Sequence, residues 1–150
     1  MRDQSFLLID IVLLFCDIVQ ICHNLFECKS KAAIAAEAFA MSNVTYYAGG
    51  KIGYVKITLE DKKAHGFEDE DTYDVINTIR RVDGVKVAIF SREREPGLYK
   101  ISTRSSCEVD VAKICATFGG GGHPGAAGCS VEESELDAAV ERIMNECGFE

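Results

Sequence analysis

The residues best suited to chemistry in this 150-residue sequence form a glycine-rich segment, residues 118–128, that reads FGGGGHPGAAG. Consecutive glycines leave the backbone accessible, and their N–H groups can turn to one side as a nest that binds an anion. A histidine beside such a nest can donate a hydrogen bond to a phosphate oxygen or stack against a base. No Lys-Ser/Thr pair follows the glycines, so the segment is not a P-loop. It predicts a loop that binds a phosphate or nucleotide through Gly119, Gly120, Gly121, Gly122 and His123.

The charge of the chain is unevenly distributed. In total, 16 basic and 24 acidic residues give a net charge of −8, which argues against a protein that coats DNA or RNA non-specifically. Residues 77–113, however, hold eight basic and five acidic residues and are +3, whereas the rest of the chain is −11. A locally basic surface on an acidic protein favours a small, specific anionic ligand over a long polyanion.

Helical and alternating patterns succeed one another along the chain. Strands are predicted over 51–59, 85–90, 98–103 and 126–131, with a turn at Pro96-Gly97. Helices are predicted over 31–41, from Thr72 with Asp71 as the N-cap, from Asp110 as an N-cap to a stop at Gly119, and from a Ser134–Asp137 capping box to Gly148. The charged segment 60–71 is predicted to be a connection. The fold class is therefore α/β, with α+β as the alternative: a mixed sheet of about four to five strands with helices packed on it.

Residues 1–30 form an apolar N-terminal region, and residues 31–150 the expected single domain. Asp10 and Asp17 interrupt the apolar stretch, and each would cost about 2.5–3.5 kcal/mol at the centre of a bilayer, so no membrane span is expected. The region also lacks the cleavage site of a signal peptide. A mostly apolar helix needs cover on most of its surface. We expect a helix or connection that packs on its own domain, on a missing domain or on a partner subunit.

Seven cysteines, an odd number without a CxxC pair, indicate reduced thiols and a cytoplasmic protein. Cys22 and His23 with Cys28 lack the paired spacing of a zinc site, so buried or partly buried thiols are expected there.

The glycine segment closely resembles the GGGGH-x-x-AAG signature of the DHH-associated C-terminal domain in the DHH phosphoesterase superfamily. The resemblance extends upstream to Val87–Glu93, to Lys100–Ser105 and to Val109–Val111, and covers about residues 25–150. It is strongest for the branch that hydrolyses short RNA oligonucleotides and 3′-phosphoadenosine 5′-phosphate.

The resemblance implies a division of labour between two domains. A larger N-terminal domain would hold two divalent metals, typically manganese, that activate the attacking water. The C-terminal domain would capture the substrate, a short RNA or DNA oligonucleotide or a nucleotide. On this chain, the four glycines and His123 would hold the nucleotide and Arg104 would clamp a phosphate, with Arg92 as a weaker candidate. Guanidinium groups suit bidentate phosphate contacts, but Arg92 and Arg94 could equally pair with Glu93 and Glu95.

One departure from the family pattern is the absence of an Asp-His-His motif from the sequence. We therefore expect the substrate-binding part of a phosphoesterase, inactive by itself, without a metal or other cofactor of its own. Its partners would be the missing catalytic domain or a partner subunit, with a homodimer as a further prediction. Two alternatives stay open: a stand-alone nucleotide-binding regulatory module, and an RNA-binding appendage like that of alanyl-tRNA synthetase.

Overall fold

The computed structural model describes residues 18–23 and 28–149, and the chain divides into two units, Met1–Lys31 and Ala32–Glu150. In the first unit residues 18–22 are helical, and the predicted helix at residues 1–17 lies outside the described residues. Cys22 and Cys28 are exposed, so the prediction that they are buried or partly buried thiols is wrong. The Sγ atom of Cys28 lies 3.2 Å from Nε2 of His23. In the described part of the chain, no helix is both long and apolar enough to cross a membrane.

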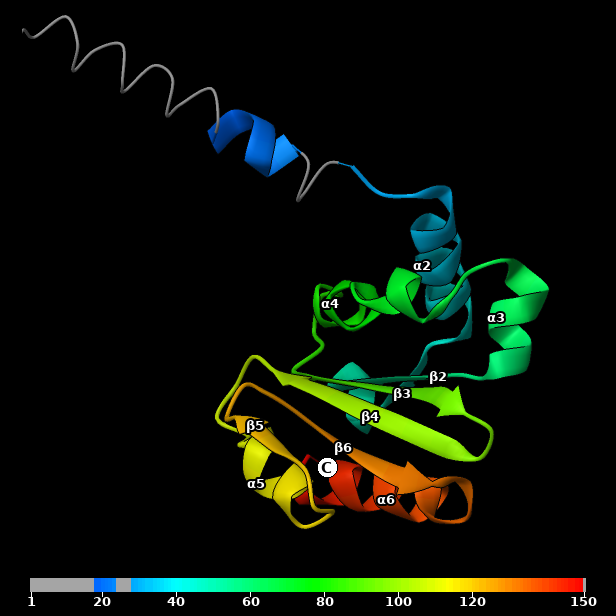
Figure 1. Ribbon diagram of the computed structural model, residues 1–150. Helices are drawn as coiled ribbons and strands as arrows, with labels where there is room; N and C mark the ends of the chain where they lie inside the picture. Colours follow the sequence, from blue (N-terminus) through cyan, green and yellow to red (C-terminus); the bar gives the residue numbers. More distant parts are fainter. Residues whose placement is uncertain (1–17, 24–27, 150) are drawn as a thin grey trace, which may run out of the picture. The chain divides into compact units, whose positions relative to one another are not determined.

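The second unit is built on a six-stranded mixed sheet in the order β1-β2-β3-β4-β6-β5 (Figure 1). Its strands are β1 (Thr45–Tyr47), β2 (Ile52–Ile57), β3 (Val87–Glu95), β4 (Leu98–Ser105), β5 (Gly121–His123) and β6 (Ala126–Glu132). Only the β2–β3 pair is parallel, and every other neighbouring pair is antiparallel. The mixed α/β class is confirmed.

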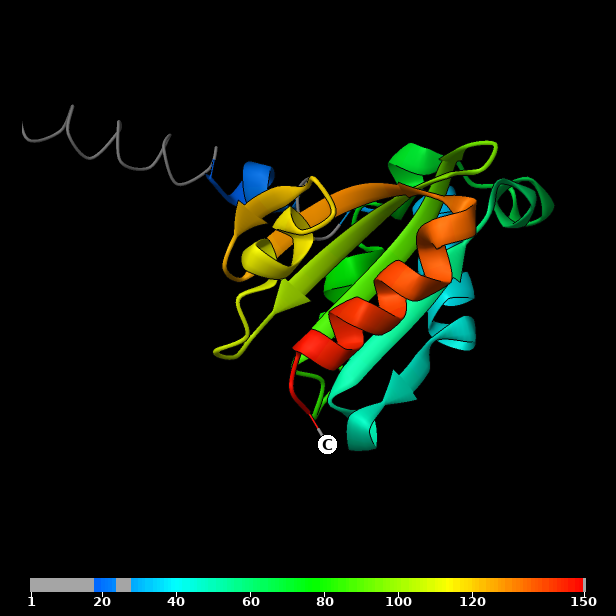
Figure 2. The same ribbon diagram turned by 90° about the horizontal axis from the view of Figure 1, so that it is seen from below.

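Helices pack on both faces of this sheet. Its helices are α2 (Lys31–Asn43), α3 (Leu59–His65), α4 (Val75–Arg80), α5 (Val111–Ala116) and α6 (Glu133–Glu146), with 3₁₀ turns η2 (Ala48–Gly50) and η3 (Asp69–Thr72). In Figure 1, α2, α3 and α4 lie above the sheet and α5 and α6 below it; Figure 2 shows α5 and α6 from below. Each layer encloses its own apolar core, so the sheet separates two cores.

Side-chain alternation divides the strand residues between the two cores. Val87 and Ile89 face α5 and α6, whereas Ala88 and Phe90 face α2 and α4. Helix α5 begins as the sequence predicts, because the Asp110 carboxylate accepts hydrogen bonds from the N–H groups of Ala112 and Lys113. This cap fixes the start of the helix that leads into the glycine segment.

Several predicted boundaries are wrong. The charged connection 60–71 contains α3 and η3 instead. Helix α4 has Asp74, not Asp71, at its N-cap. Helix α6 begins at Glu133, directly after β6, so no Ser134–Asp137 capping box starts it. Helix α3 does have a capping box, between Thr58 and Asp61.

Candidate functional site

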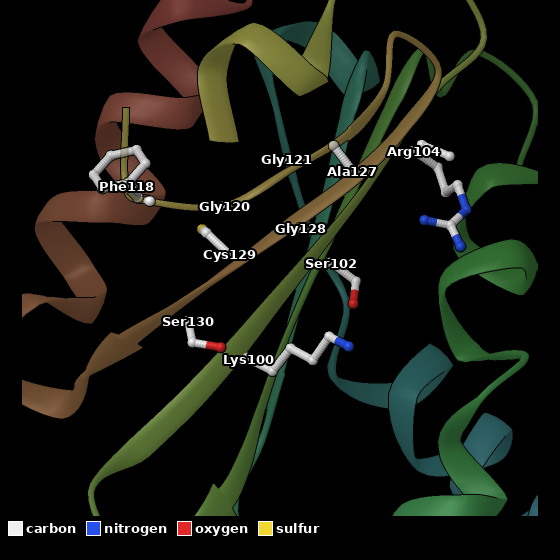
Figure 3. A pocket seen from close by; sticks show the side chains of 12 residues that line it. Lys100, Ser102, Arg104, Phe118, Gly120, Gly121, Ala127, Gly128, Cys129 and Ser130 are labelled. Atoms are coloured by element: carbon white, nitrogen blue, oxygen red, sulfur yellow. The ribbon is translucent and has the colours of Figure 1, made fainter. Parts of the chain in front are cut away.

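A cavity of about 480 Å³ opens on the half of the sheet formed by β4, β6 and β5 (Figure 3). Its wall is made by alternate residues of β4, by residues 126–130 of β6, and by residues 118–121 at the end of α5 and the start of β5. Two segments separated in the sequence, the β4 strand and the glycine segment, therefore meet at one cavity. Except for Arg92, the residues that the sequence predicted for nucleotide binding belong to these two segments.

The polar groups of β4 that line the cavity are Lys100, Ser102 and Arg104. They alternate with Tyr99, Ile101 and Thr103, which are buried on the other face, so the pleat of the strand alone puts the three on one side. Figure 3 shows the ammonium group of Lys100 and the guanidinium group of Arg104 pointing to the same side of β4. The arrangement presents two cations and a hydroxyl in a row about 13 Å long.

Arg104 is half-buried, and its Nη1 donates to the carbonyl oxygen of Thr103 at 3.0 Å. This bond occupies one of five N–H donors of the guanidinium group. The other N–H donors of the guanidinium group are on the side of β4 that lines the cavity. The predicted phosphate-clamping residue thus lines the cavity, which is the placement that this role requires.

The first two glycines of the segment do not form the predicted anion-binding nest. The N–H of Gly119 donates to Ala116 and that of Gly120 donates to Cys115, at 3.1 and 3.0 Å. With φ of +71°, Gly119 instead reverses the chain after α5, which is the helix stop predicted from the sequence. Backbone N–H groups of Gly119 and Gly120 are therefore satisfied within the protein.

The glycine segment continues as a short edge strand, β5, that pairs with β6. The close approach of the two strands explains why two of these positions are occupied by glycine. An added Cβ at Gly120 would overlap the carbonyl oxygen of Gly128, and one at Gly122 would overlap that of Ala126. Gly121 is different, because an added Cβ there would meet no atom within 4 Å. The protein itself does not require glycine at 121, yet this residue lines the cavity.

His123 is exposed at the end of β5, next to the Pro124-Gly125 turn. It pairs with Ala126, which in turn pairs with Arg104. Residues paired across neighbouring strands share a face of the sheet, so His123 and Arg104 lie in one row at the same end of the cavity. His123 does not itself line the cavity, and its predicted ligand contact stays a prediction.

Arg92 lies apart from the cavity wall. It is only 6% exposed, and its Nη1 donates to Oγ1 of Thr72 at 2.9 Å and lies 3.5 Å from Oδ2 of Asp69. The pairing expected from the sequence, with Glu93 or Glu95, is replaced by this contact with η3. Arg92 is therefore a buried ion-pair partner in this structure, and its contact with a phosphate stays a prediction.

Asp69 is the centre of a cluster of cations beside Arg92. Lys62, only 5% exposed, donates to its Oδ1 at 2.8 Å, and Nε of Arg94 lies 3.8 Å from its Oδ2. Burial alone would raise the pKa of Asp69, but the hydrogen bond from Lys62 and the charges of Arg92, Lys62 and Arg94 lower it overall. The Asp69 carboxylate thus lies within 4 Å of three cationic side chains, two of them buried.

Two buried thiols, Cys115 of α5 and Cys129 of β6, lie beneath the glycine segment. Their mutual hydrogen bond lowers the pKa of Cys115 to about 7, against the opposing effect of burial, and raises that of Cys129. The Thr103 hydroxyl lies 3.5 Å from Sγ of Cys115 and donates to the carbonyl oxygen of Ala127. These contacts join α5, β4 and β6 under the cavity and fix the position of its wall.

Sequence reasoning missed Lys100, Ser102 and Ser130 as cavity residues. The signal was available, since Lys100 and Ser102 precede Arg104 at intervals of two on a predicted strand. Within residues 18–23 and 28–149, no group of three or more His, Cys, Asp or Glu side chains is placed to hold a metal. The expectation that the metals belong to another domain stays a prediction.

The model of the DHHA1 domain matches residues 48–148, which hold the cavity, the basic strand and the glycine segment together. The chain belongs to the DHHA1 domain family. The resemblance to the DHH phosphoesterase superfamily is thereby confirmed. This DHHA1 chain is 38% identical, over 104 residues, to the bifunctional oligoribonuclease and PAP phosphatase NrnA of Thermus thermophilus. The match covers 69% of the chain and 30% of the Thermus protein.

Solved structures share the DHHA1 fold. An exopolyphosphatase-related protein from Bacteroides fragilis matches 99% of this chain and 43% of its own with a TM-score of 0.78 and 21% identity. The C-Ala domain of Aquifex aeolicus alanyl-tRNA synthetase matches 64% of this chain and 89% of its own with a TM-score of 0.50 and 14% identity. The DHHA1 chain thus spans less than half the length of the Thermus and Bacteroides proteins.

Proposed function

We propose that this DHHA1 unit is the substrate-binding part of a DHH-family phosphoesterase that acts on short oligonucleotides or on nucleotides carrying a free phosphate. The observation that carries the proposal is the cavity that the basic row of β4 and Gly121 both line. Cationic side chains supply the phosphate contacts, and a glycine without a structural need lets a ligand approach the main chain. The similarity to an oligoribonuclease and PAP phosphatase supports this class of substrate.

The chemical step is proposed to take place on a separate DHH catalytic domain, which would hold two divalent metal ions, typically manganese, and activate the attacking water. The groups of this chain would bind and orient the ligand. Arg104 and Lys100 would neutralise phosphate charge, and His123 would donate a hydrogen bond or stack at the end of the row nearest Arg104. By itself the chain is proposed to bind without turnover. A cytoplasmic location and a homodimer remain part of this proposal.

Replacing Arg104 by alanine is expected to weaken binding of adenosine monophosphate by about 10- to 100-fold, because a charge-assisted phosphate contact contributes about 1.5–3 kcal/mol. Isothermal titration calorimetry of the full chain measures this. The substitution Arg104→Lys keeps the positive charge but loses the planar guanidinium group that can bind a phosphate with two parallel N–H donors. An intermediate affinity is therefore expected.

The matched control is Arg80→Ala, which removes an exposed arginine of α4 that does not line the cavity. It is expected to bind adenosine monophosphate as the unchanged protein does. Titrating His123→Ala in parallel separates the contribution of the histidine from that of Arg104. Unchanged affinity in both Arg104→Ala and His123→Ala would refute the proposed site.

A further inference from the structure

Tyr73, between η3 and α4, is 65% exposed, and it is the most exposed of the five tyrosines. Exposure of a large aromatic ring to this extent is unfavourable, because burial of the ring would lower the free energy of the folded protein. The ring is nevertheless held in place. The guanidinium carbon of Arg92 lies 5.5 Å from the ring centroid, so one face of the ring is covered by a cation.

The group that holds the ring is itself fixed. Arg92 is buried and contacts Thr72 and Asp69, both of the turn η3 that directly precedes Tyr73. The same arginine therefore fixes the turn and stacks on the ring that follows it. A ring held in this way loses little conformational freedom when a ligand stacks on its other face.

Arg92 also connects Tyr73 with a residue of the cavity wall. Arg92 of β3 pairs with Lys100 of β4, and such neighbours have Cβ atoms about 4.5–5.5 Å apart. Lys100 lines the cavity at the end opposite to Arg104, and helix α4, which follows Tyr73, packs against both β3 and β4. The exposed ring is therefore placed near the Lys100 end of the basic row.

We propose that the open face of Tyr73 stacks a nucleobase of a second nucleotide when a single-stranded oligonucleotide occupies the cavity. The inference rests on the proposed function and adds a second base-binding position to it. The first nucleotide occupies the Arg104 end, and the connecting phosphate lies along the row towards Lys100. The row, about 13 Å long, exceeds the size of one phosphate group. Single-stranded nucleic acids are bound in this way, by cations along the backbone and aromatic rings under the bases.

The test compares two ligands on the full chain: adenosine monophosphate and 5′-phosphorylated diadenylate. The substitution Tyr73→Leu keeps an apolar side chain at the position but removes the stacking surface. It is expected to weaken diadenylate binding by about 10- to 100-fold and to leave adenosine monophosphate binding unchanged. Tyr73→Phe is expected to bind both ligands as the unchanged protein does, because the ring remains. Tyr46→Ala, at an exposed tyrosine of β1, serves as the control for loss of an aromatic ring elsewhere.

Two results would overturn the inference while leaving the proposed function intact. One is unchanged diadenylate affinity in Tyr73→Leu; the other is an equal loss for both ligands in a variant whose thermal unfolding is unchanged. If Tyr73→Leu fails to fold, Tyr73→Ser gives the same comparison, because it removes the ring at this exposed position without placing an apolar side chain in solvent. If the unchanged protein binds neither ligand, the proposed function fails and the second base position with it.

Discussion

Alanine at Gly120 is expected to destabilise the folded chain by about 2–3 kcal/mol, whereas alanine at Gly121 is expected to leave stability unchanged and to weaken ligand binding. The two residues are neighbours in the same segment, and the same methyl group is added in each case. An added Cβ at Gly120 would overlap the Gly128 carbonyl oxygen and lie 2.6 Å from Cβ of Cys129. The neighbouring atoms belong to β6, a paired strand, so they have little room to move.

At Gly121 the added methyl would meet no protein atom within 4 Å, and the residue has no positive φ that would disfavour alanine. Stability is therefore expected to change by less than about 0.5 kcal/mol. The methyl group would, however, stand at the wall of the cavity that Lys100 and Arg104 share. If a phosphate approaches the main chain at this point, Gly121→Ala should weaken adenosine monophosphate binding, and Gly121→Val should weaken it by about tenfold or more.

Urea unfolding and calorimetric titration of the same samples check both halves of this prediction. Unfolding gives the free energy for Gly120→Ala and Gly121→Ala, and titration gives the affinity of the variants that fold. Gly66→Ala is a useful reference, because this glycine after α3 has a φ of +71°, an added Cβ there would meet no atom within 4 Å, and the residue does not line the cavity. Normal affinity in Gly121→Val would show that the ligand does not approach the main chain there.

The glycine segment also shows how far the sequence alone could go. Its motif and the β4 pattern located the cavity, because glycine spacing and strand alternation are local properties. Its conformation could not be predicted, because glycine is unfavourable in strands and four in a row indicate a loop. Pairing with β6 overrides that preference, so β5 appears as a strand. The three-residue β1 is too short to show a period, which is why four to five strands were expected and six are present.

The burial of Arg92 depends on contacts between segments distant in the sequence, which a local sequence pattern does not show. Two residues beyond the predicted strand 85–90, Arg92 could face solvent, a ligand or the core. Its partners Asp69 and Thr72 lie 23 and 20 residues earlier, in and directly after the charged segment 60–71 that was predicted to be a connection. Lys62 is another example, because a charged residue in a charged segment is normally exposed, and its burial follows only from the position of Asp69.

Asparagine at Asp69 is expected to destabilise the chain by about 3 kcal/mol. The substitution preserves the shape of the side chain but removes the negative charge that balances Lys62 and Arg92, which are 5% and 6% exposed. A buried cation that loses its partner carries the cost of desolvation without compensation. The matched control is Glu70→Gln, which removes an exposed carboxylate from the same turn and is expected to change stability by less than about 0.5 kcal/mol.

The same substitution should change the dependence of stability on pH. In the folded chain the pKa of Asp69 is lowered from 3.8, because the hydrogen bond from Lys62 and the charges of three cations outweigh the effect of burial. The unfolded state therefore binds this proton more tightly, so the stabilisation is complete well above pH 3.8 and is lost as the pH falls through the lower, folded pKa. Urea unfolding from pH 7 to pH 3 measures it. Asp69→Asn should lose less stability over that range than the unchanged protein or Glu70→Gln. Equal losses in all three would mean that the charge of Asp69 does not hold Lys62 and Arg92 in place, and so does not fix Arg92 against the ring of Tyr73.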